Sequence, residues 1–363
     1  MSAPDRLVLK VGGALFEGWK SVSIQLGIDR IAGCFDLGLT ERWPNSPRDW
    51  AIAPGEHCAI TIGGEPVISG YVDDSCVSFD DETHEIRVTG RDRTGDLVDC
   101  SAPTTSFAGI SFLEIARKLT KPYQIAVSDE SGLGGKIVPK FSIQAGDSVF
   151  STLEKLARQV GVLLVSDGLG GLKITRGGRA GQATETLETG CNILAGEIRN
   201  SHAELYSSIT VKGQASGASA DEYDLTRAAP SGSVSAGPAA TSRMSGIGRH
   251  RPLIIVSETQ ADAARCRQRA EWEAGNREAK SKKISVTVQG WRQSDGQLWQ
   301  INQAVPLIAP WLRSDGQWLI SALVFTLDES GTKTVLTLVN KNAFDLLPEI
   351  PKKDNSNNNK YKV

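Results

Sequence analysis

The N-terminal part of the chain alternates apolar and polar positions with a period of two, which predicts a series of short β-strands. A Gly63-Gly64 pair between two of these runs is typical of a tight hairpin turn. The apolar positions are Leu7, Leu9 and Val11, then Val22, Ile24, Leu26 and Ile28, then Cys58, Ile60 and Ile62, and finally Ile86 and Val88. We therefore expect residues 1–104 to form a small antiparallel β-barrel domain.

The period changes to that of a helix in the next part of the chain, where two helices are predicted. Ser111 and Glu114 have the spacing of a capping box and predict the start of the first helix. The second helix is expected to begin at Asp147 or Ser148 and to end at Gly161, which adopts a left-handed C-cap conformation easily. Their apolar faces would be Phe112, Ile115, Ala116 and Leu119 in the first helix, and Val149, Leu153, Leu156 and Val160 in the second.

A hairpin is predicted over residues 162–175, around an Asp167-Gly168 turn. With the two helices it defines an α+β insert over residues 105–180. The stretch IQAGDSVFSTLEKLARQVGVLL within the insert also resembles the start of a LysM peptidoglycan-binding module. LysM modules continue into a second helix, whereas this chain turns at once into the hairpin. The resemblance therefore implies a LysM-like shape, but it does not imply sugar binding.

The remaining strands predict a second β-barrel over residues 181–347, with two interruptions. Residues 213–250 are rich in Gly, Ala and Ser and cannot bury enough apolar area to offset their ordering entropy, so we expect a long exposed loop. A helix is predicted over residues 259–279. Its narrow stripe of small residues would be Ala263, Cys266, Ala270 and Ala274. The polar residues 348–363 are expected to form a disordered tail.

Two segments of the chain resemble each other, one starting at Ile68 and the other at Ile320. The pattern of each segment predicts two strands around an acidic turn, followed by a short ending that begins with Asp-Leu. The alignment, with a small gap, sets Ile86 on Val335 and Asp96-Leu97-Val98 on Asp345-Leu346-Leu347. We therefore expect two related barrels that superpose.

Composition and charge narrow the function classes. The 363 residues exceed what one compact core usually holds, and 40% hydrophobic with 23% charged residues is ordinary for globular domains. A net charge of −2 without a long basic block argues against tight non-specific nucleic-acid binding, which needs many Lys and Arg side chains. The sequence begins without a signal-peptide pattern and has no run of ~20 apolar residues. We expect folding in a cytoplasm and no membrane insertion.

The cysteines lie far apart and form no Cys-x-x-Cys pair, so they lack the spacing of a zinc site. They are Cys34, Cys58, Cys76, Cys100, Cys191 and Cys266, and we expect buried free thiols. The sequence Gly146-Asp147-Ser148 matches the nucleophile motif of GDS-type lipases, whose base lies in an Asp-x-x-His. The histidines are His57, His84, His202 and His250, none of them in that motif. Helix capping by Asp147 or Ser148 is the interpretation we favour.

Other candidate motifs also have structural explanations. The Gly-rich stretches 131–136 and 168–171 lack the Gly-Lys-Ser/Thr ending of a phosphate-binding P-loop. Acidic pairs such as Asp73-Asp74 are more typical of solvated turns than of a glycosidase cleft. The basic cluster is Arg243, Arg249, His250 and Arg251, without interleaved aromatics, so we expect a role in loop solubility or a subunit contact. Several tryptophans lie towards the C-terminus, where they are suited to core packing or to a subunit interface. They are Trp272, Trp291, Trp299, Trp311 and Trp318. We assign no catalytic, cofactor-binding or metal-binding residue and expect no cofactor.

The order of barrel, α+β insert and second barrel resembles the baseplate hub proteins of contractile-tailed phages, especially the Mu-type tail protein P and the late-control D family. The resembling stretches are FSIQAGDSVFSTLEKLARQVGVLLVSDGLGGLKITR and GWRQSDGQLWQINQAVPLIAPWLRSDGQWLISALVFTLDESGTKTVLTLVNKNAFDLL, and GQLWQINQAVPL is the most telling piece. Together with the N-terminal barrel they cover most of the chain, apart from the predicted loop and tail.

In that family three subunits, each with two similar barrels, form a ring between a six-fold tail tube and a three-fold spike. The resemblance therefore implies a non-enzymatic homotrimer of the virion tail baseplate that assembles in the host cytoplasm. Its partners would be the tail tube protein, the central spike protein and the tape-measure protein, with DNA only in transit. Two alternatives stay open: a cell-wall-binding or peptidoglycan-hydrolysing tail component, and the spike base of a type VI secretion system.

Overall fold

A computed structural model describes residues 5–40, 52–81, 84–214, 231–235, 247–260 and 263–344. The chain divides into two units: a larger one of Met1–Asn200 with Lys282–Phe344, and a smaller one of Ser201–Ser281 with Asp345–Val363. The domain boundaries expected from the sequence, at residues 104, 180 and 347, stay a prediction. In the described part of the chain, no helix is both long enough and apolar enough to cross a bilayer. The predicted tail over residues 348–363 lies outside the described residues.

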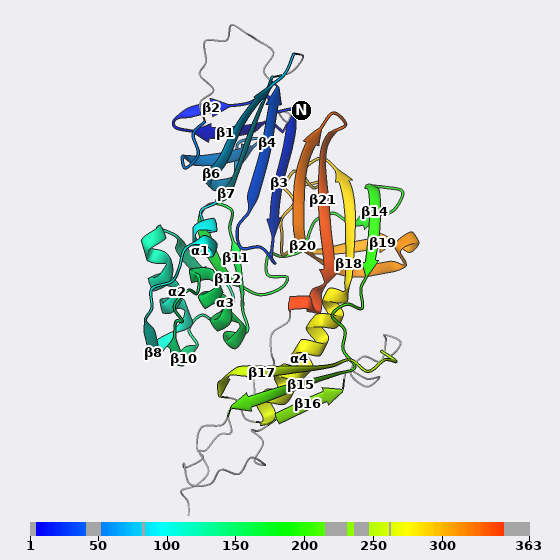
Figure 1. The fold of residues 1–363 in the computed structure, drawn as a ribbon. Coiled ribbons are helices and arrows are strands. Elements are labelled where there is room, and N and C mark those ends of the chain that lie inside the picture. The colour runs from blue at the N-terminus through cyan, green and yellow to red at the C-terminus, as the bar shows by residue number, and fades with distance from the viewer. Residues whose placement is uncertain are drawn as a thin grey trace, which may run out of the picture. The chain divides into compact units, whose positions relative to one another are not determined.

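One large sheet forms the framework of the larger unit (Figure 1). Its main path runs β14-β18-β21-β20-β3-β4-β7-β6-β5-β1-β2, and β19 pairs with both β13 and β20. The strands are β1 (Leu7–Val11), β2 (Ala14–Phe16), β3 (Ser21–Gly27), β4 (Cys34–Thr40), β5 (His57–Ile62), β6 (Glu65–Phe79), β7 (His84–Asp92), β13 (Leu187–Glu188), β14 (Ile193–Asn200), β18 (Lys282–Gln289), β19 (Ala304–Ala309), β20 (Ser314–Asp328) and β21 (Gly331–Asn340), with short 3-10 turns η2 (Pro310–Leu312) and η3 (Lys341–Phe344). The mainly β fold predicted from the sequence is confirmed.

Alternate residues of these strands are buried because successive side chains of a strand point to opposite faces of a sheet. Leu7, Leu9 and Val11 are buried, as predicted from their spacing. The same core contains Trp291 and Phe325, whose rings meet edge to face with centroids 6.3 Å apart. The period-two pattern therefore places one continuous apolar core along the sheet.

The sheet contains one five-strand arrangement twice. The first half has the spatial order β3-β4-β7-β6-β5, and the second half has the order β14-β18-β21-β20-β19, with the strands in the same sequence order. The long strands β6 and β20 have 15 residues each, and each carries one bulge residue against its hairpin partner, Asp73 and Ser321. With the bulges aligned, every residue of β6 and β7 corresponds to the residue 248 positions later.

Two related halves are thus present, but their register differs from the one read from the sequence. The sequence comparison set Ile86 on Val335, whereas the bulges set Ile86 on Thr334. Both Ile86 and Thr334 are buried, while Val335 is only partly so. The expected match of Asp96-Leu97-Val98 with Asp345-Leu346-Leu347 falls partly outside the described residues.

The halves do not form two separate closed barrels, contrary to the expectation from the sequence. Both edges of β3 are occupied, one by β4 and one by β20, so the second half continues directly into the first. Among the described residues the path of the sheet stays open and ends at β14 and β2. The reason is that β20 takes the edge of β3 that a closing strand of the first half would need.

The predicted α+β insert follows β7. Its elements are α1 (Gly95–Asp99), β8 (Ser106–Ser111), α2 (Phe112–Thr120), η1 (Lys121–Tyr123), β9 (Ala126–Asp129), β10 (Ile137–Ser142), α3 (Val149–Val160), β11 (Leu163–Ser166) and β12 (Gly171–Thr175). The capping box of Ser111 and Glu114 forms, all eight predicted apolar helix positions are buried, and Gly161 ends α3 with φ 79°. The predicted hairpin is β11–β12, to which β9 adds in parallel. These local predictions are confirmed.

The smaller unit combines a three-stranded sheet with one long helix. β15 (Ser208–Gln214) pairs antiparallel with β16 (Ser231–Ser235) and parallel with β17 (Pro252–Gln260). α4 (Ala263–Ser281) confirms the predicted helix with slightly shifted ends, and Ala270 and Ala274 of its small-residue stripe pack with Ile209 and Val211 of β15. β16 lies inside the predicted loop over residues 213–250, so that part of the loop is a strand, which its pairing with β15 stabilises.

Candidate functional site

A seam between β20 and β3 joins the two halves of the sheet (Figure 1). At its centre Phe325 lies opposite Ile24, and these side chains are 1% and 0% exposed. Directly opposed apolar pairs on one face of an antiparallel ladder stabilise the pairing of its strands. The seam therefore shows how one half of this sheet docks on another, strand to strand.

Besides the outer edge of β2, part of β6 and the outer edge of β14 lack a strand partner among the described residues. β6 pairs with β5 only as far as Tyr71, so the part of β6 from Asp73 to Phe79 is paired on its β7 side alone. β14 ends the path of the sheet. Large apolar side chains are exposed at both places: Val77 (56%) and Phe79 (82%) on β6, and Leu194 (55%) on β14. Unpaired edges that carry exposed apolar residues are where another strand can add.

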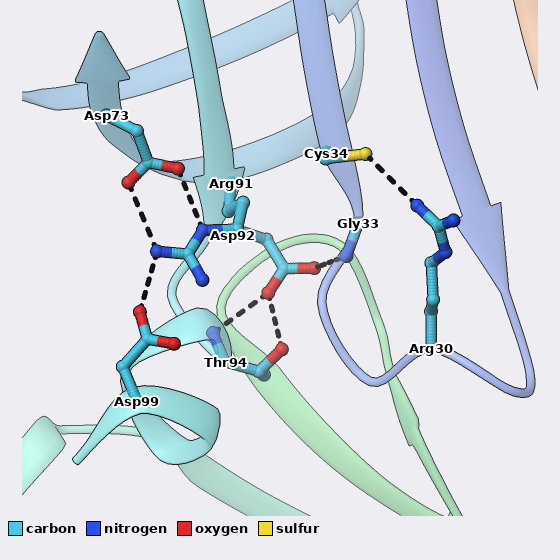
Figure 2. Close-up of polar contacts among 8 residues, drawn as sticks. All are labelled: Arg30, Gly33, Cys34, Asp73, Arg91, Asp92, Thr94 and Asp99. Carbon is cyan, nitrogen blue, oxygen red and sulfur yellow. Dashed lines mark hydrogen bonds and ion pairs between the residues drawn. The ribbon is translucent and has the colours of Figure 1, made fainter.

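A buried carboxylate lies where β7 ends and the insert begins (Figure 2). Asp92 accepts hydrogen bonds from Gly33 N at 2.6 Å, Thr94 N at 2.8 Å, Thr94 Oγ1 at 2.5 Å and Ser166 Oγ at 2.8 Å. Burial raises the pKa of Asp92, and these four hydrogen bonds oppose part of that shift. Because its partners come from the β3–β4 turn, the start of α1 and β11, this one side chain ties the insert to the first half of the sheet.

Arg91 forms a second polar link beside Asp92 (Figure 2). Its Nε lies 2.8 Å from Asp73 Oδ2 and its Nη2 lies 2.7 Å from Asp99 Oδ2. The hydrogen bonds to Asp99 and Asp73 raise the pKa of Arg91, and the bond from Arg91 lowers the pKa of Asp99. All three side chains are more than a third exposed, so solvent screens these pairs and they orient the bulge of β6 more than they stabilise it.

The Gly-Asp-Ser stretch before α3 has a structural role for each of its polar side chains. Ser148 Oγ accepts a hydrogen bond from Ser151 N at 3.1 Å, which is the geometry of an N-cap. Asp147 instead forms an ion pair with Lys155 at 2.8 Å. The capping prediction is therefore confirmed, and Ser148 rather than Asp147 is the cap.

The first Gly-rich stretch wraps around a carboxylate of the chain itself. Asp129 accepts hydrogen bonds from the backbone N–H groups of Ser131, Gly132 and Gly134, at 2.9, 3.2 and 2.9 Å. Burial acts to raise the pKa of Asp129, but the Ser131 hydroxyl, which donates at 2.6 Å, and these backbone bonds together lower it. A phosphate-binding loop would present such N–H groups to a ligand, whereas here they bind Asp129.

The second Gly-rich stretch docks against β6. Gly168 has φ 75°, and a Cβ added there would lie 2.4 Å from the carbonyl oxygen of Val67. The Gly168 carbonyl accepts a hydrogen bond from Ser69 N at 2.7 Å. The residue must therefore be glycine, both for its left-handed backbone and for this close approach.

Among the described residues, no three His, Cys, Asp or Glu side chains gather as a metal site would require. The cysteines whose side chains are described, Cys34, Cys58, Cys76, Cys100 and Cys191, are all free, and the side chain of Cys266 lies outside that part of the structure. Cys58 is buried, and burial raises the pKa of its thiol to about 12. Cys76 and Cys191 are exposed, so the prediction of buried thiols is wrong for these two. Cys76 lies on the part of β6 that pairs with β7 alone among the described residues.

The basic cluster contributes to the packing of the smaller unit. Arg251 donates to two backbone carbonyls and lies over the ring of Tyr206, 5.4 Å from its centroid. Arg277 lies at the same distance from that ring. Arg243 lies outside the described residues. Sequence reasoning had not identified Tyr206, the aromatic partner of these cations.

The C-terminal tryptophans divide between the core and the surface. Trp291, Trp299 and Trp318 are buried, which core packing explains. Trp311 is 87% exposed, so it alone of these four matches the alternative expectation of a subunit interface. The side chain of Trp272 lies outside the described residues.

Sequence reasoning did not identify three of the residues described above, Val77 and Phe79 at the edge of β6 and the buried Asp92. Val77 and Phe79 alternate with polar residues, a signal that was available and that predicts a half-buried strand face. Asp92 stands in a stretch rich in Arg and Asp that reads as a solvated turn, and nothing local marks it as buried.

Comparison with known protein families matches most of the chain. The family described as "Mu phage baseplate assembly protein GpP-like, N-terminal" matches residues 6–92. The second domain of "Baseplate hub protein gp44-like" matches residues 94–176, and the fourth domain of "Mu phage baseplate assembly protein GpP" matches residues 262–347.

Individual relatives agree with these matches. The chain is 32% identical over 350 residues to the baseplate hub protein gp44 of Escherichia phage Mu, with 94% of this chain and 89% of that protein covered. The 43 kDa tail protein of prophage MuSo2 from Shewanella oneidensis has a similar structure, with TM-score 0.81, 34% identity, and 94% and 100% of the two chains covered. A tail protein from Neisseria meningitidis MC58 shares the fold, with TM-score 0.81, 23% identity, and 94% and 99% covered.

Proposed function

The chain belongs to the family of Mu-type baseplate hub proteins, and on that premise we propose that three copies of it form a ring in the tail baseplate. The ring joins the six-fold tail tube to the three-fold central spike and leaves a channel for DNA ejection. The observation that carries this proposal is the repeated five-strand arrangement within one chain. Three copies present six similar halves, so the ring combines exact three-fold with approximate six-fold symmetry.

The sheet edges also favour a closed assembly. Among the residues described, β14 and part of β6 each keep one edge without a strand partner, with Val77, Phe79 and Leu194 exposed beside them. A closed ring covers such edges, which would otherwise promote uncontrolled association. The open sheet of the single chain is in this sense one third of a complete structure.

Partners and location follow from that position. The tail tube protein binds one face of the ring, the central spike protein binds the other, and the tape-measure protein is a further partner. The hub assembles in the host cytoplasm and ends in the virion. DNA passes through the channel only in transit, which suits a net charge of −2, because tight phosphate binding would slow its passage.

We propose no catalytic role for any residue. Ser148, the one side chain in a nucleophile-like motif, is occupied as the cap of α3. Purified protein should therefore show no esterase or muramidase turnover and no retention on peptidoglycan. Either activity would favour the alternative of a cell-wall-binding or hydrolysing tail component.

The decisive experiment measures oligomeric mass together with symmetry. Sedimentation of the full-length protein over a wide concentration range should give a trimer, in equilibrium with monomer at low concentration. Averaged electron micrographs should show a ring with three-fold symmetry, and purified tube and spike proteins should bind to opposite faces of it. A monomer at high concentration, or a stable dimer, would contradict the proposal.

A further inference from the structure

We propose that neighbouring copies in the ring pair strand to strand. The part of β6 from Asp73 to Phe79 in one copy lies antiparallel to β14 of the next copy. The inference rests on the homotrimeric ring proposed above and adds its contact surface and its register. In this register Val77 lies opposite Ile198, and Cys76 lies opposite Arg199. The occupant of each open edge is a second copy of this chain.

The template for this contact is the seam inside the chain. β20 of the second half corresponds to β6 of the first, and β3 of the first half corresponds to β14 of the second. Within one chain β20 already pairs with β3. Around a ring of repeated halves, junctions within a chain alternate with junctions between chains. Equivalent halves use equivalent edges, so the junction between chains is β6 with β14.

The register follows from the same correspondence. Val77 takes the place of Phe325, because the two hairpins share their bulge position. Ile198 takes the place of Ile24, because both hold the same position in the ladder that continues into the next two strands. Phe325 lies opposite Ile24 in the seam, so Val77 lies opposite Ile198 in the contact between copies.

Burial differs between the two halves at these equivalent positions. Phe325 is 1% exposed and Leu327 is half-buried, whereas their counterparts Val77 and Phe79 are 56% and 82% exposed. In the seam β3 supplies the cover, and β14 of a neighbouring copy would supply it for β6. Phe79 would then lie opposite Gly196, whose Cβ side is lined by the apolar side chains of Leu312 and Ile193, at 3.2 and 3.9 Å from the position that a Cβ would take.

The opposite face of the proposed pair is polar, as suits a solvated surface. Cys76 and Arg199 are exposed in the single chain and would lie opposite each other there. Asp74 would lie on the diagonal from Arg199, where opposite charges attract. A slip of one residue would turn Val77 and Ile198 to different faces, so the apolar face specifies the register.

The contact is head to tail, since each copy offers one β6 edge and one β14 edge. A head-to-tail contact forms a closed ring when the rotation between copies fits a whole number of them. With three copies, every β6 and β14 edge is paired, and the ring cannot grow further.

Cys76 allows the register to be tested with single substitutions on β14. Arg199→Cys places a thiol opposite Cys76, and opposed residues of an antiparallel pair have Cα atoms about 4.5–5.5 Å apart, within disulfide range. Glu197→Cys is the matched control, on the same strand and face but on the diagonal, about 7–8 Å away. Both are made with Cys191→Ser and Cys266→Ser, which remove the other thiol that is exposed among the described side chains and the one whose side chain is not described.

After mild oxidation, the Arg199→Cys protein should migrate as a covalent trimer on a non-reducing gel, with about tenfold more product than Glu197→Cys. Adding Cys76→Ser should abolish it. A trimeric mass without this cross-link, or equal cross-linking of the two variants, overturns the strand pair and leaves the hub ring standing. A monomer at every concentration overturns both.

Hydrogen exchange supplies a second measurement that needs no substitution. Backbone amides of residues 74–79 and 196–200 should exchange more slowly in the concentrated trimer than in the diluted monomer, because a new ladder protects them. Unchanged exchange of both segments in a trimer overturns the strand pair.

Discussion

Replacing Asp92 with alanine tests whether one buried side chain holds the insert to the sheet. The change removes four hydrogen bonds and leaves the backbone N–H groups of Gly33 and Thr94 buried without their acceptor. An orphaned buried donor costs about 1–3 kcal/mol, so two of them cost about 2–6 kcal/mol. Alanine also relieves the cost of burying the carboxylate, which is what raises the pKa of Asp92. We expect the free energy of unfolding to fall by about 2–4 kcal/mol.

Urea unfolding measures this loss with two probes. Tryptophan fluorescence reports on the sheet, because Trp291 and Trp299 lie in its core, and far-ultraviolet circular dichroism reports on the helices. Asp92→Asn keeps the shape and one acceptor oxygen and should lose less. Asp99→Asn, which removes an exposed carboxylate from Arg91, should change stability only slightly. An Asp92→Ala protein as stable as the wild type, or an equal loss from Asp99→Asn, would refute the reasoning.

The pH dependence of Asp92 has a definite sign. Its pKa in the folded protein lies above the ordinary value of 3.8, so the folded chain binds this proton more tightly than the unfolded chain. The resulting contribution to stability is complete below the unfolded pKa and is lost as pH rises through the folded pKa. Relative to Asp92→Asn, the wild type should therefore lose stability as pH rises from below 3.8 towards neutrality.

Ser148→Ala removes the cap of α3 and should lower the free energy of unfolding by about 0.5–2 kcal/mol in thermal melts, without altering background hydrolase readings. Asp147→Ala should cost less, and turnover that disappears only with Ser148→Ala would overturn the structural interpretation. Phe79→Asp should shift trimer to monomer in sedimentation equilibrium, whereas Phe79→Leu should keep the trimer; a trimer that tolerates the charge would contradict the proposed contact. Gly168→Ala should lower the melting temperature more than Gly178→Ala, because both glycines have positive φ but only Gly168 has a backbone oxygen in the way. Equal shifts would show that backbone conformation alone matters.

Local features could be predicted because each depends on residues close in sequence. The capping box at Ser111 and the C-cap at Gly161 are determined within one helical turn. The open sheet and its seam could not be predicted, since they depend on pairs such as Phe325 with Ile24, which lie far apart in the chain. The register of the repeat was wrong because the sequence comparison introduced a gap, whereas the two hairpins carry their bulges at equivalent positions, Asp73 and Ser321, and match without a gap.

Surface residues of an assembly present a different difficulty. Val77, Phe79 and Trp311 are apolar, and a sequence pattern marks such residues as buried without saying whether their own chain or another covers them. Asp92 presents the reverse case, because a carboxylate in a polar stretch is ordinarily solvated and only the arrival of Gly33 and Ser166 from distant segments buries it.

The connection between β14 and β18 holds the whole segment of residues 201–281 between two neighbouring strands of the sheet. In the first half, the short turn over residues 28–33 joins the corresponding strands, whereas the second half holds residues 201–281 at that place. Asn200 pairs directly with Lys282, and Ser201 N donates to the Ser281 carbonyl at 2.8 Å, so the chain leaves and returns at adjacent positions. An addition of this geometry extends a hairpin tip and alters no strand. A chain with a short turn in place of residues 201–281 would therefore keep the same strands and the same register on either side of the connection.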